Sequence, residues 1–216
     1  GGAVPRMNAP DPWRPRRDRA AWGLVSSLSL LVALGISIRE LPALAVPLDW
    51  SIRAVAAPSR LALAEAAGWV ASVTNWPWPE LCALLGAVWF GVFRQRWWSA
   101  ALLAVSAVLV WNWTGVLKHT FARPRPNEPL NLSSYPSGHV LGVTVAAVAF
   151  MWVVAKLWVW VVGCAAIAIT AADRIIIDAH WFSDVVGGAA AGVALVSAVA
   201  LGISFCQRLS RRLALS

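Results

Sequence analysis

Two polar stretches of the chain lie beside long apolar runs and hold side chains that can do chemistry. They are Lys118, Arg125 and His139 in the first stretch, and Arg174, His180 and Asp184 in the second. Ionisable residues near the ends of membrane-embedded helices are functional candidates, because lipid tolerates them poorly. Three cations without a comparable acidic cluster indicate an anionic ligand, and guanidinium groups fit pairs of phosphate oxygens.

The tetrapeptide Pro136-Ser137-Gly138-His139 opens an apolar run that continues through Val154. The first N–H groups of a helix have no partner inside it and lie at the positive end of its dipole, so an anion is favoured there. Gly138 has no side chain, which lets an oxyanion approach the backbone closely. The sequence therefore predicts a preformed phosphate cradle at the start of this helix.

His180 and Asp184 are four residues apart, which places them on one face at the start of a helix. A carboxylate that holds one ring nitrogen fixes the tautomer and presents the other nitrogen as a nucleophile. His139, from the other stretch, is placed to protonate a departing oxygen. Each residue alone also has an ordinary explanation, as an interfacial polar group, a contact to lipid headgroups or a chance pair. The joint pattern points to catalysis.

This joint pattern resembles the three-part signature of the type 2 phosphatidic acid phosphatases, whose active sites are related to those of vanadium haloperoxidases. The family signature reads Lys-x6-Arg-Pro, then Pro-Ser-Gly-His, then Ser-Arg-x5-His-x3-Asp. Here it runs from Lys118 to Asp184, and every spacing matches. One position departs, because Asp173 stands where the family has serine before Arg174. We expect the Asp173 carboxylate to point away from a bound phosphate or to pair with a neighbouring cation.

The resemblance implies a role for each member of the signature. His180 attacks phosphorus and forms a phosphohistidine, Asp184 orients His180, and His139 protonates the leaving oxygen. Phosphate binding falls to the remaining members, which are Lys118, Arg125, Ser137, Gly138 and Arg174. Because fixed cations supply the charge neutralisation, neither a metal nor a cofactor is expected. Four polar residues near the signature are interpreted as loop or rim residues: His119, Arg123, Glu128 and Asp178.

The elements that carry these residues are predicted to be membrane-spanning helices. Hydrophobic residues make up 59% of the chain and charged residues 13%, whereas a soluble domain has about 25% charged residues. We expect an all-α polytopic membrane protein with six spans, at about 20–38, 79–93, 99–117, 139–155, 157–177 and 181–205. Residues 20–205 are read as one domain. Residues 1–19 are read as a cloning remnant ahead of Met7 followed by a basic cytoplasmic tail, and 206–216 as a second such tail.

The distribution of Lys and Arg predicts the orientation. With the N-terminus in the cytoplasm, eleven of the 18 basic residues fall on the cytoplasmic side and seven outside. The net charge of +8 is therefore read as a topology signal of a plasma-membrane protein rather than a nucleic-acid site. Both polar stretches then emerge on the extracytoplasmic face. The apolar segment 61–74 is short and contains Glu65, so we expect it to lie at the outer interface or to dip partly into the membrane; a seventh span remains the alternative.

These observations predict a lipid phosphatase at the outer leaflet that acts on a polyprenyl diphosphate, phosphatidic acid or phosphatidylglycerol phosphate, with the polyprenyl diphosphate as first choice. A lipid phosphotransferase and a catalytically silent lipid-binding or transport protein are the alternatives. Haloperoxidase activity is disfavoured, because such enzymes are usually soluble. Gly188 and Gly192, four residues apart, indicate close helix packing, either within the bundle or in a homodimer.

Overall fold

The computed structural model describes residues 17–213, and within that range the chain is helical without strands. The α-helices are α1 (Arg17–Glu40), α2 (Pro42–Ala56), α3 (Arg60–Thr74), α4 (Trp78–Val88), α5 (Trp97–Phe121), α6 (Gly138–Val154), α7 (Leu157–Ile176) and α8 (Phe182–Leu213). A 3-10 turn (Ala57–Ser59) joins α2 to α3, and a π-helical turn (Trp89–Phe93) extends α4. Tails 1–16 and 214–216, on which parts of the terminal predictions fall, lie outside the described residues.

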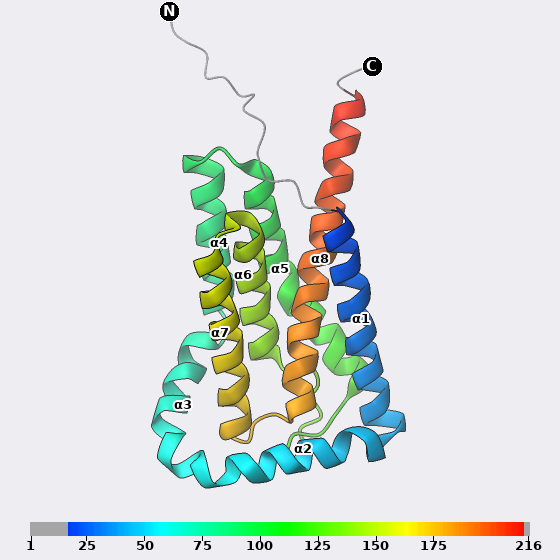
Figure 1. The fold of residues 1–216 in the computed structure, drawn as a ribbon, viewed down its shortest axis with the longest axis vertical. Helices are drawn as coiled ribbons and strands as arrows, with labels where there is room; N and C mark the ends of the chain where they lie inside the picture. The colour runs from blue at the N-terminus through cyan, green and yellow to red at the C-terminus, as the bar shows by residue number, and fades with distance from the viewer. Residues whose placement is uncertain (1–16, 214–216) are drawn as a thin grey trace, which may run out of the picture.

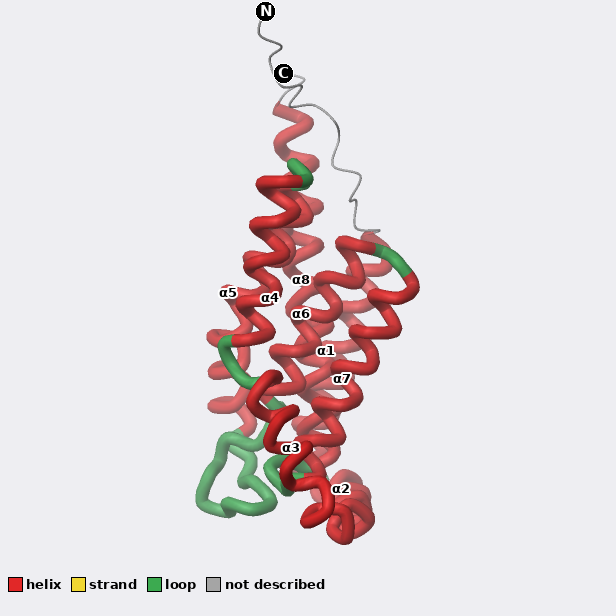
Figure 2. Tube along the Cα trace, turned by 90° about the vertical axis from the view of Figure 1, so that its left-hand side faces the viewer, coloured by secondary structure: helices red, strands yellow, loops and turns green. Residues whose placement is uncertain are grey.

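Six of the helices form an elongated bundle, with α6 packed against α4, α5, α7 and α8 (Figure 1). The start of α1 and the end of α8 lie at one end of this bundle. Helix α2 runs across the opposite end, and α3 rises from it obliquely along the side of α7. The loops that join α5 to α6 and α7 to α8 lie at the same end as α2 (Figure 2).

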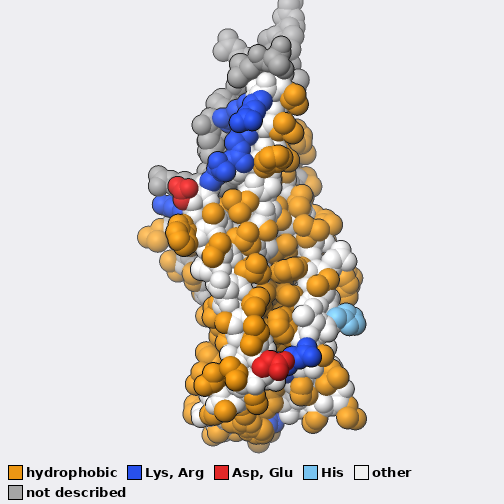
Figure 3. Space-filling model, turned by 90° about the vertical axis from the view of Figure 1, so that its right-hand side faces the viewer, with side chains coloured by type: hydrophobic (Ala, Val, Ile, Leu, Met, Phe, Trp, Pro, Cys, Tyr) orange, Lys and Arg blue, Asp and Glu red, His pale blue; other side chains and the backbone are white. Residues whose placement is uncertain are grey.

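Four helices, α1, α5, α7 and α8, are long and apolar enough to cross a membrane by length and composition. The other two expected spans coincide with shorter apolar helices, at Trp78–Phe93 and Gly138–Val154. Figure 3 shows a mainly hydrophobic flank, with Lys and Arg side chains gathered toward the end where α8 stops. The fold is therefore that of a multi-pass helical membrane protein. Helix α8 continues to Leu213, eight residues past the expected end, because polar residues replace apolar ones there without breaking the helix.

Helix α2 was not expected from the sequence, and two prolines lie within its range. Pro42 occupies the first turn, where a missing N–H costs no helical hydrogen bond, and Pro47 is accommodated inside the helix. Helix α3 has 15 residues, which at 1.5 Å per residue is about 22 Å and too short to cross a hydrocarbon core of about 30 Å. It packs against α7 and α6.

The Gly188 and Gly192 pair brings α8 against α6 within the chain, which is the first of the two expected uses. A Cβ on Gly188 would lie 2.6 Å from the carbonyl oxygen of Ser137, and one on Gly192 would lie 2.7 Å from Cβ of Thr144. Any larger residue at these positions would push the two helices apart. This close approach also allows the Ser137 N–H to donate to the Asp184 carbonyl oxygen at 2.9 Å.

Candidate active site

The loop 122–137 and the segment 177–181 meet at the α2 end of the bundle, and the predicted site residues lie in them or in the adjoining turns of α5, α6, α7 and α8 (Figure 2). Helix α5 ends at Phe121, and Ala122 takes a left-handed conformation with φ 44°, which turns the chain into the loop. The loop then closes on itself, since Ser134 N–H donates to the Arg123 carbonyl and Arg125 N–H to the Asn131 carbonyl. This closure fixes the path of the chain from Lys118, in the last turn of α5, to His139, in the first turn of α6.

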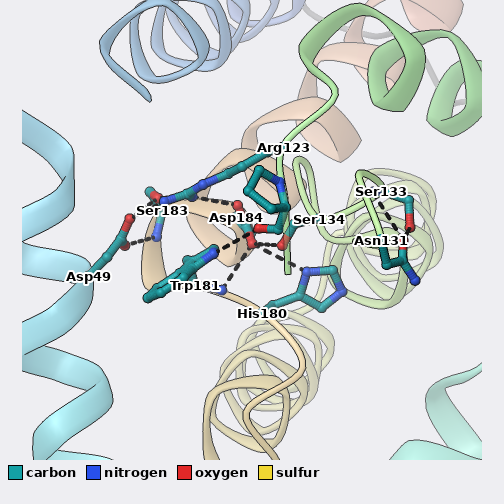
Figure 4. A network of polar contacts seen from close by, with 10 residues as sticks. Asp49, Arg123, Asn131, Ser133, Ser134, His180, Trp181, Ser183 and Asp184 are labelled. Atoms are coloured by element: carbon teal, nitrogen blue, oxygen red, sulfur yellow. Dashed lines mark hydrogen bonds and ion pairs between the residues drawn. The ribbon is translucent and has the colours of Figure 1, made fainter. Parts of the chain in front are cut away.

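His180 and Asp184 form a buried pair (Figure 4). The Nδ1 atom of His180 lies 3.4 Å from Oδ2 of Asp184, long for a hydrogen bond, as is common in sites without ligand. Since Asp184 offers only acceptors when ionised, this contact favours the tautomer with the proton on Nδ1 and leaves Nε2 with a free lone pair. The same Oδ2 accepts hydrogen bonds from the Trp181 N–H, at 2.9 Å, and from the Ser134 hydroxyl.

Arg123 completes the support of Asp184; it lies in the loop between α5 and α6, as interpreted from the sequence, but its side chain is buried there and not exposed at the rim. Its side chain is only 7% exposed; Nη1 donates to Oδ1 of Asp184 at 2.7 Å, and Nη2 to Oδ2 of Asp49 at 2.6 Å. Ser183 joins the same cluster, because its hydroxyl accepts from Arg123 and donates to Asp49. Asp49 lies in α2, so the unexpected helix is tied directly to the residues behind His180.

Burial keeps His180 neutral. It lowers the pKa of the His180 ring below its ordinary value, and the charges of Arg125 and Lys118 act in the same direction. The hydrogen bond to Asp184 opposes this shift and raises the pKa. A neutral imidazole with its proton on Nδ1 has the lone pair on Nε2 that a nucleophile needs.

A cavity of 430 Å³ lies on the other side of this ring. Its wall contains five of the predicted site residues, namely Lys118, Arg125, Gly138, His139 and His180. Nε of Arg125 is buried without a hydrogen-bond partner among residues 17–213. A buried donor that lacks a partner is costly in free energy. The Nε–H group of Arg125 is therefore suited to bind an acceptor that enters the cavity.

Two predicted phosphate-binding residues, Ser137 and Arg174, are buried but are not in the cavity wall as the described residues form it. Both Nε and Nη2 of Arg174 donate to Oδ2 of Asp173, with the Nε contact at 2.6 Å. Of the two expectations for Asp173, pairing with a cation is the one observed. The Ser137 hydroxyl has no partner in the described part of the chain, whereas its N–H, expected to be free for an anion, is occupied by Asp184.

The three other residues interpreted as loop or rim residues lie around the cluster in different ways. His119 is exposed at the cavity wall, and Glu128 is exposed in the loop, where it accepts from Asn131. Asp178 is partly buried and binds two arginines, Arg53 at 2.6 Å and Arg60 at 2.7 Å. Through these ion pairs Asp178 connects the end of α7 to α2 and α3.

The protein is thus a multi-pass membrane protein built from a bundle of apolar helices. One end of the bundle holds a buried His–Asp pair and a cavity lined by cations. Residues 95–208, more than half of the chain, match the model of the PAP2 superfamily, and the chain belongs to this superfamily. The structure also resembles that of a transmembrane PAP2-type phosphatidylglycerolphosphate phosphatase from Bacillus subtilis, with a TM-score of 0.61 and 19% identity over 87% of this chain and 97% of that one.

Two curated relatives match a smaller part of the chain. An undecaprenyl-diphosphatase from Sulfolobus acidocaldarius is 28% identical over 107 residues, which is 45% of this chain and 52% of the relative. A lipid A 1-phosphatase from Porphyromonas gingivalis is 32% identical over 104 residues, which is 46% of this chain and 23% of the relative. The matches therefore span about half of the first relative and less than a quarter of the second.

Proposed function

We propose that the protein is a membrane lipid phosphatase that hydrolyses a lipid phosphate or diphosphate through a phosphohistidine on His180. The observation that carries this proposal is the position of His180 between two different environments. Its Nδ1 faces the Asp184 carboxylate, and the ring also lines a cavity shared with Lys118 and Arg125. This arrangement supports a nucleophilic Nε2 next to a bound anion.

In the proposed reaction, Nε2 of His180 attacks the terminal phosphorus while the bond from phosphorus to the leaving oxygen breaks. His139 gives its proton to the departing oxygen, which leaves as the alcohol of a lipid phosphate or as the lipid monophosphate of a diphosphate. Water then attacks the phosphohistidine, its proton passes to His139, and the phosphorus–nitrogen bond breaks to release phosphate. Lys118, Arg125 and the Gly138 N–H stabilise the charge on the phosphoryl oxygens. Ser137 and Arg174 can contribute only if the bound phosphate replaces their present contacts. These are the bond from the Ser137 N–H to the Asp184 carbonyl oxygen and the ion pair of Arg174 with Asp173.

The names of the relatives support a lipid substrate, since they are phosphatases of an undecaprenyl diphosphate, of lipid A and of a phosphatidylglycerol phosphate. The candidate substrates for this chain are a polyprenyl diphosphate, phosphatidic acid and phosphatidylglycerol phosphate. Exposed apolar helices would keep the enzyme among such lipids in the plasma membrane.

The proposed orientation has six spans within residues 20–205, with the termini in the cytoplasm and the cavity on the extracytoplasmic side. It rests on the excess of basic residues near the ends of α1 and α8. Single cysteines placed at Glu128 and at Arg211, in a chain without Cys82, Cys164 and Cys206, test it in intact cells. A membrane-impermeant thiol reagent should label position 128 and not position 211, and the reverse pattern would overturn the orientation.

The function is tested by phosphate release from a panel of the three lipids in detergent, with the native protein beside His180→Ala. Release by the native protein only, unchanged by a chelator, is the expected result. Dependence on added divalent metal, or equal release by His180→Ala, would contradict it. A second experiment tests for a phosphotransferase by incubating the protein with a lipid phosphate that carries radiolabelled phosphorus in a mixed lipid extract. A phosphotransferase would produce labelled lipid instead of free phosphate.

A further inference from the structure

The wall of the cavity beside His180 also contains residues that the proposed reaction does not use. Among them are Thr74, Asn75, Glu80, Thr114 and Gly142. Glu80 is the acidic residue of this wall, and it stands in a cavity whose other charged residues are cations. A carboxylate among phosphate-binding groups would weaken anion binding unless it serves another part of the ligand.

Glu80, which belongs to α4, meets α6 at Gly142, one helical turn beyond His139. A Cβ placed on Gly142 would lie 3.2 Å from Oε1 of Glu80, so the carboxylate sits directly against α6 at that residue. Gly142 follows His139 by three residues, which is about 4.5 Å along the helix axis and the same face. In the proposed reaction His139 protonates the departing alcohol, so Glu80 faces the space that the alcohol part of the substrate enters.

One oxygen of the Glu80 carboxylate is free to accept a hydrogen bond. Its Oε2 is buried and has no partner among the described residues. The two hydroxyls nearby are engaged with backbone carbonyls, Thr74 with Val70 at 2.7 Å and Thr114 with Val110 at 2.8 Å. Glu80 also lies in the first turn of α4, where the helix dipole favours a negative charge.

From this geometry we infer that Glu80 recognises a hydrogen-bond donor, a hydroxyl or an amine, on the alcohol part of the lipid phosphate. A buried carboxylate oxygen without a donor is costly, and a ligand donor removes that cost. The inference rests on the proposed phosphatase function and narrows its substrate class. It favours a monophosphate whose alcohol carries a donor near the ester oxygen. It disfavours a polyprenyl diphosphate, because the second phosphate would lie on the Glu80 side and be repelled.

The test compares substrates that differ at one group. A 1-acyl-glycerol 3-phosphate is measured beside its 2-deoxy and 2-amino analogues with the same acyl chain, and beside a prenyl diphosphate. The native protein should hydrolyse the hydroxyl and amino substrates with kcat/KM at least about tenfold above that of the deoxy substrate. Equal kcat/KM values for all three monophosphates would mean that water, and not the substrate, donates the hydrogen bond to Glu80. A preference for the diphosphate would mean that the substrate needs no hydrogen-bond donor near the ester oxygen. Either result overturns the inference.

Two variants assign the preference to Glu80. Glu80→Leu removes the acceptor and should bring the ratio of hydroxyl to deoxy substrate close to one. Glu80→Gln keeps a neutral acceptor, so it should retain part of the hydroxyl preference while the amine preference collapses. The matched controls are the same changes at Glu65, an exposed carboxylate on α3, which should leave both ratios as in the native protein. An unchanged ratio in Glu80→Leu, or loss of activity toward every substrate in a folded Glu80 variant, overturns the inference.

The outcomes also separate this inference from the function on which it rests. The native protein alone supplies the substrate ratios, so a variant that fails to fold does not remove the test. Phosphate release from all monophosphates at equal kcat/KM would overturn the role of Glu80 and leave the phosphatase function standing. No release from any substrate would overturn the function itself, and the inference with it.

Discussion

The two sides of the His180 ring differ in how their polar groups are satisfied. On the Asp184 side, both carboxylate oxygens accept hydrogen bonds, and Arg123 extends the network to Asp49 in α2 (Figure 4). On the cavity side, Nε of Arg125 and Oε2 of Glu80 are buried without partners in the described part of the chain. A satisfied network holds its members in place, whereas unsatisfied groups in a cavity are complementary to a ligand. The predictions below disturb one side at a time.

The largest effect is expected from Asp184→Asn, on the satisfied side. The amide can donate to Nδ1 and thereby favour the tautomer with its proton on Nε2, which removes the lone pair that attacks phosphorus. We expect kcat to fall about ten-thousandfold with a smaller change in KM. Phosphate release kinetics measure both, and Glu128→Gln in the exposed loop is the control. A fall of less than tenfold would show that Asp184 does not set the tautomer.

Arg123→Ala should destabilise the fold, because it leaves Asp49 and Asp184 buried without their shared cation. Removing one partner of a buried ion pair costs about 3 to 5 kcal/mol. The comparison is Arg53→Ala, which breaks a partly exposed pair with Asp178 and should cost about 1 kcal/mol. Thermal unfolding of the two variants in the same detergent measures the difference. Equal losses would mean that Arg123 is no more important than a surface cation.

The burial of His180 predicts how stability depends on pH. Its pKa in the fold lies below the value of about 6.5 in the unfolded chain, so below pH 6.5 the unfolded state binds more protons. Stability should therefore fall as the pH falls from about 6.5 toward the folded pKa, with a slope of at most about 1.4 kcal/mol per pH unit from this residue. Unfolding of the native protein and of His180→Gln over this pH range measures the contribution. The same slope in both would contradict it.

Asp173→Ser should give the smallest effect on phosphate binding, beside a loss of stability because it breaks a buried ion pair, and it installs the serine that the signature has at this position. The carboxylate of Asp173 now holds Nε and Nη2 of Arg174. Releasing that guanidinium should strengthen inhibition by inorganic phosphate about three- to tenfold, the scale of one added charge-assisted hydrogen bond at a partly solvated site. Inhibition constants of the two proteins give the result. An unchanged constant would mean that Arg174 does not reach the phosphate.

The cavity side of the site is the part that local sequence predicts well. Lys118, Arg125, His139 and His180 occupy fixed spacings in or beside the ends of apolar helices, and these helices bring them to one end of the bundle. The helices themselves follow from the apolar composition of each run. Their ends are less predictable, as the extension of α8 to Leu213 shows, because a polar turn continues a helix as readily as it ends one.

The supporting side could not be predicted, because its partners are far apart in the chain. Asp49 lies in a helix that was not expected from the sequence and that contains Pro42 and Pro47, and it meets Arg123 only after α2 has crossed the end of the bundle. Nothing in the local sequence distinguishes Arg123 from an exposed loop cation. Glu80 was also missed, since a glutamate at a helix start usually serves the helix dipole alone.

The central claim, that Nε2 of His180 accepts the phosphoryl group, is tested most directly by trapping the labelled protein. A lipid substrate with radiolabelled phosphate is mixed with the native protein, quenched within milliseconds in alkali and digested to locate the label. We expect label on the peptide that contains His180, stable in alkali and lost in acid, and none in His180→Ala. Label on another residue, or full turnover by a protein that never carries label at any quench time, would contradict it.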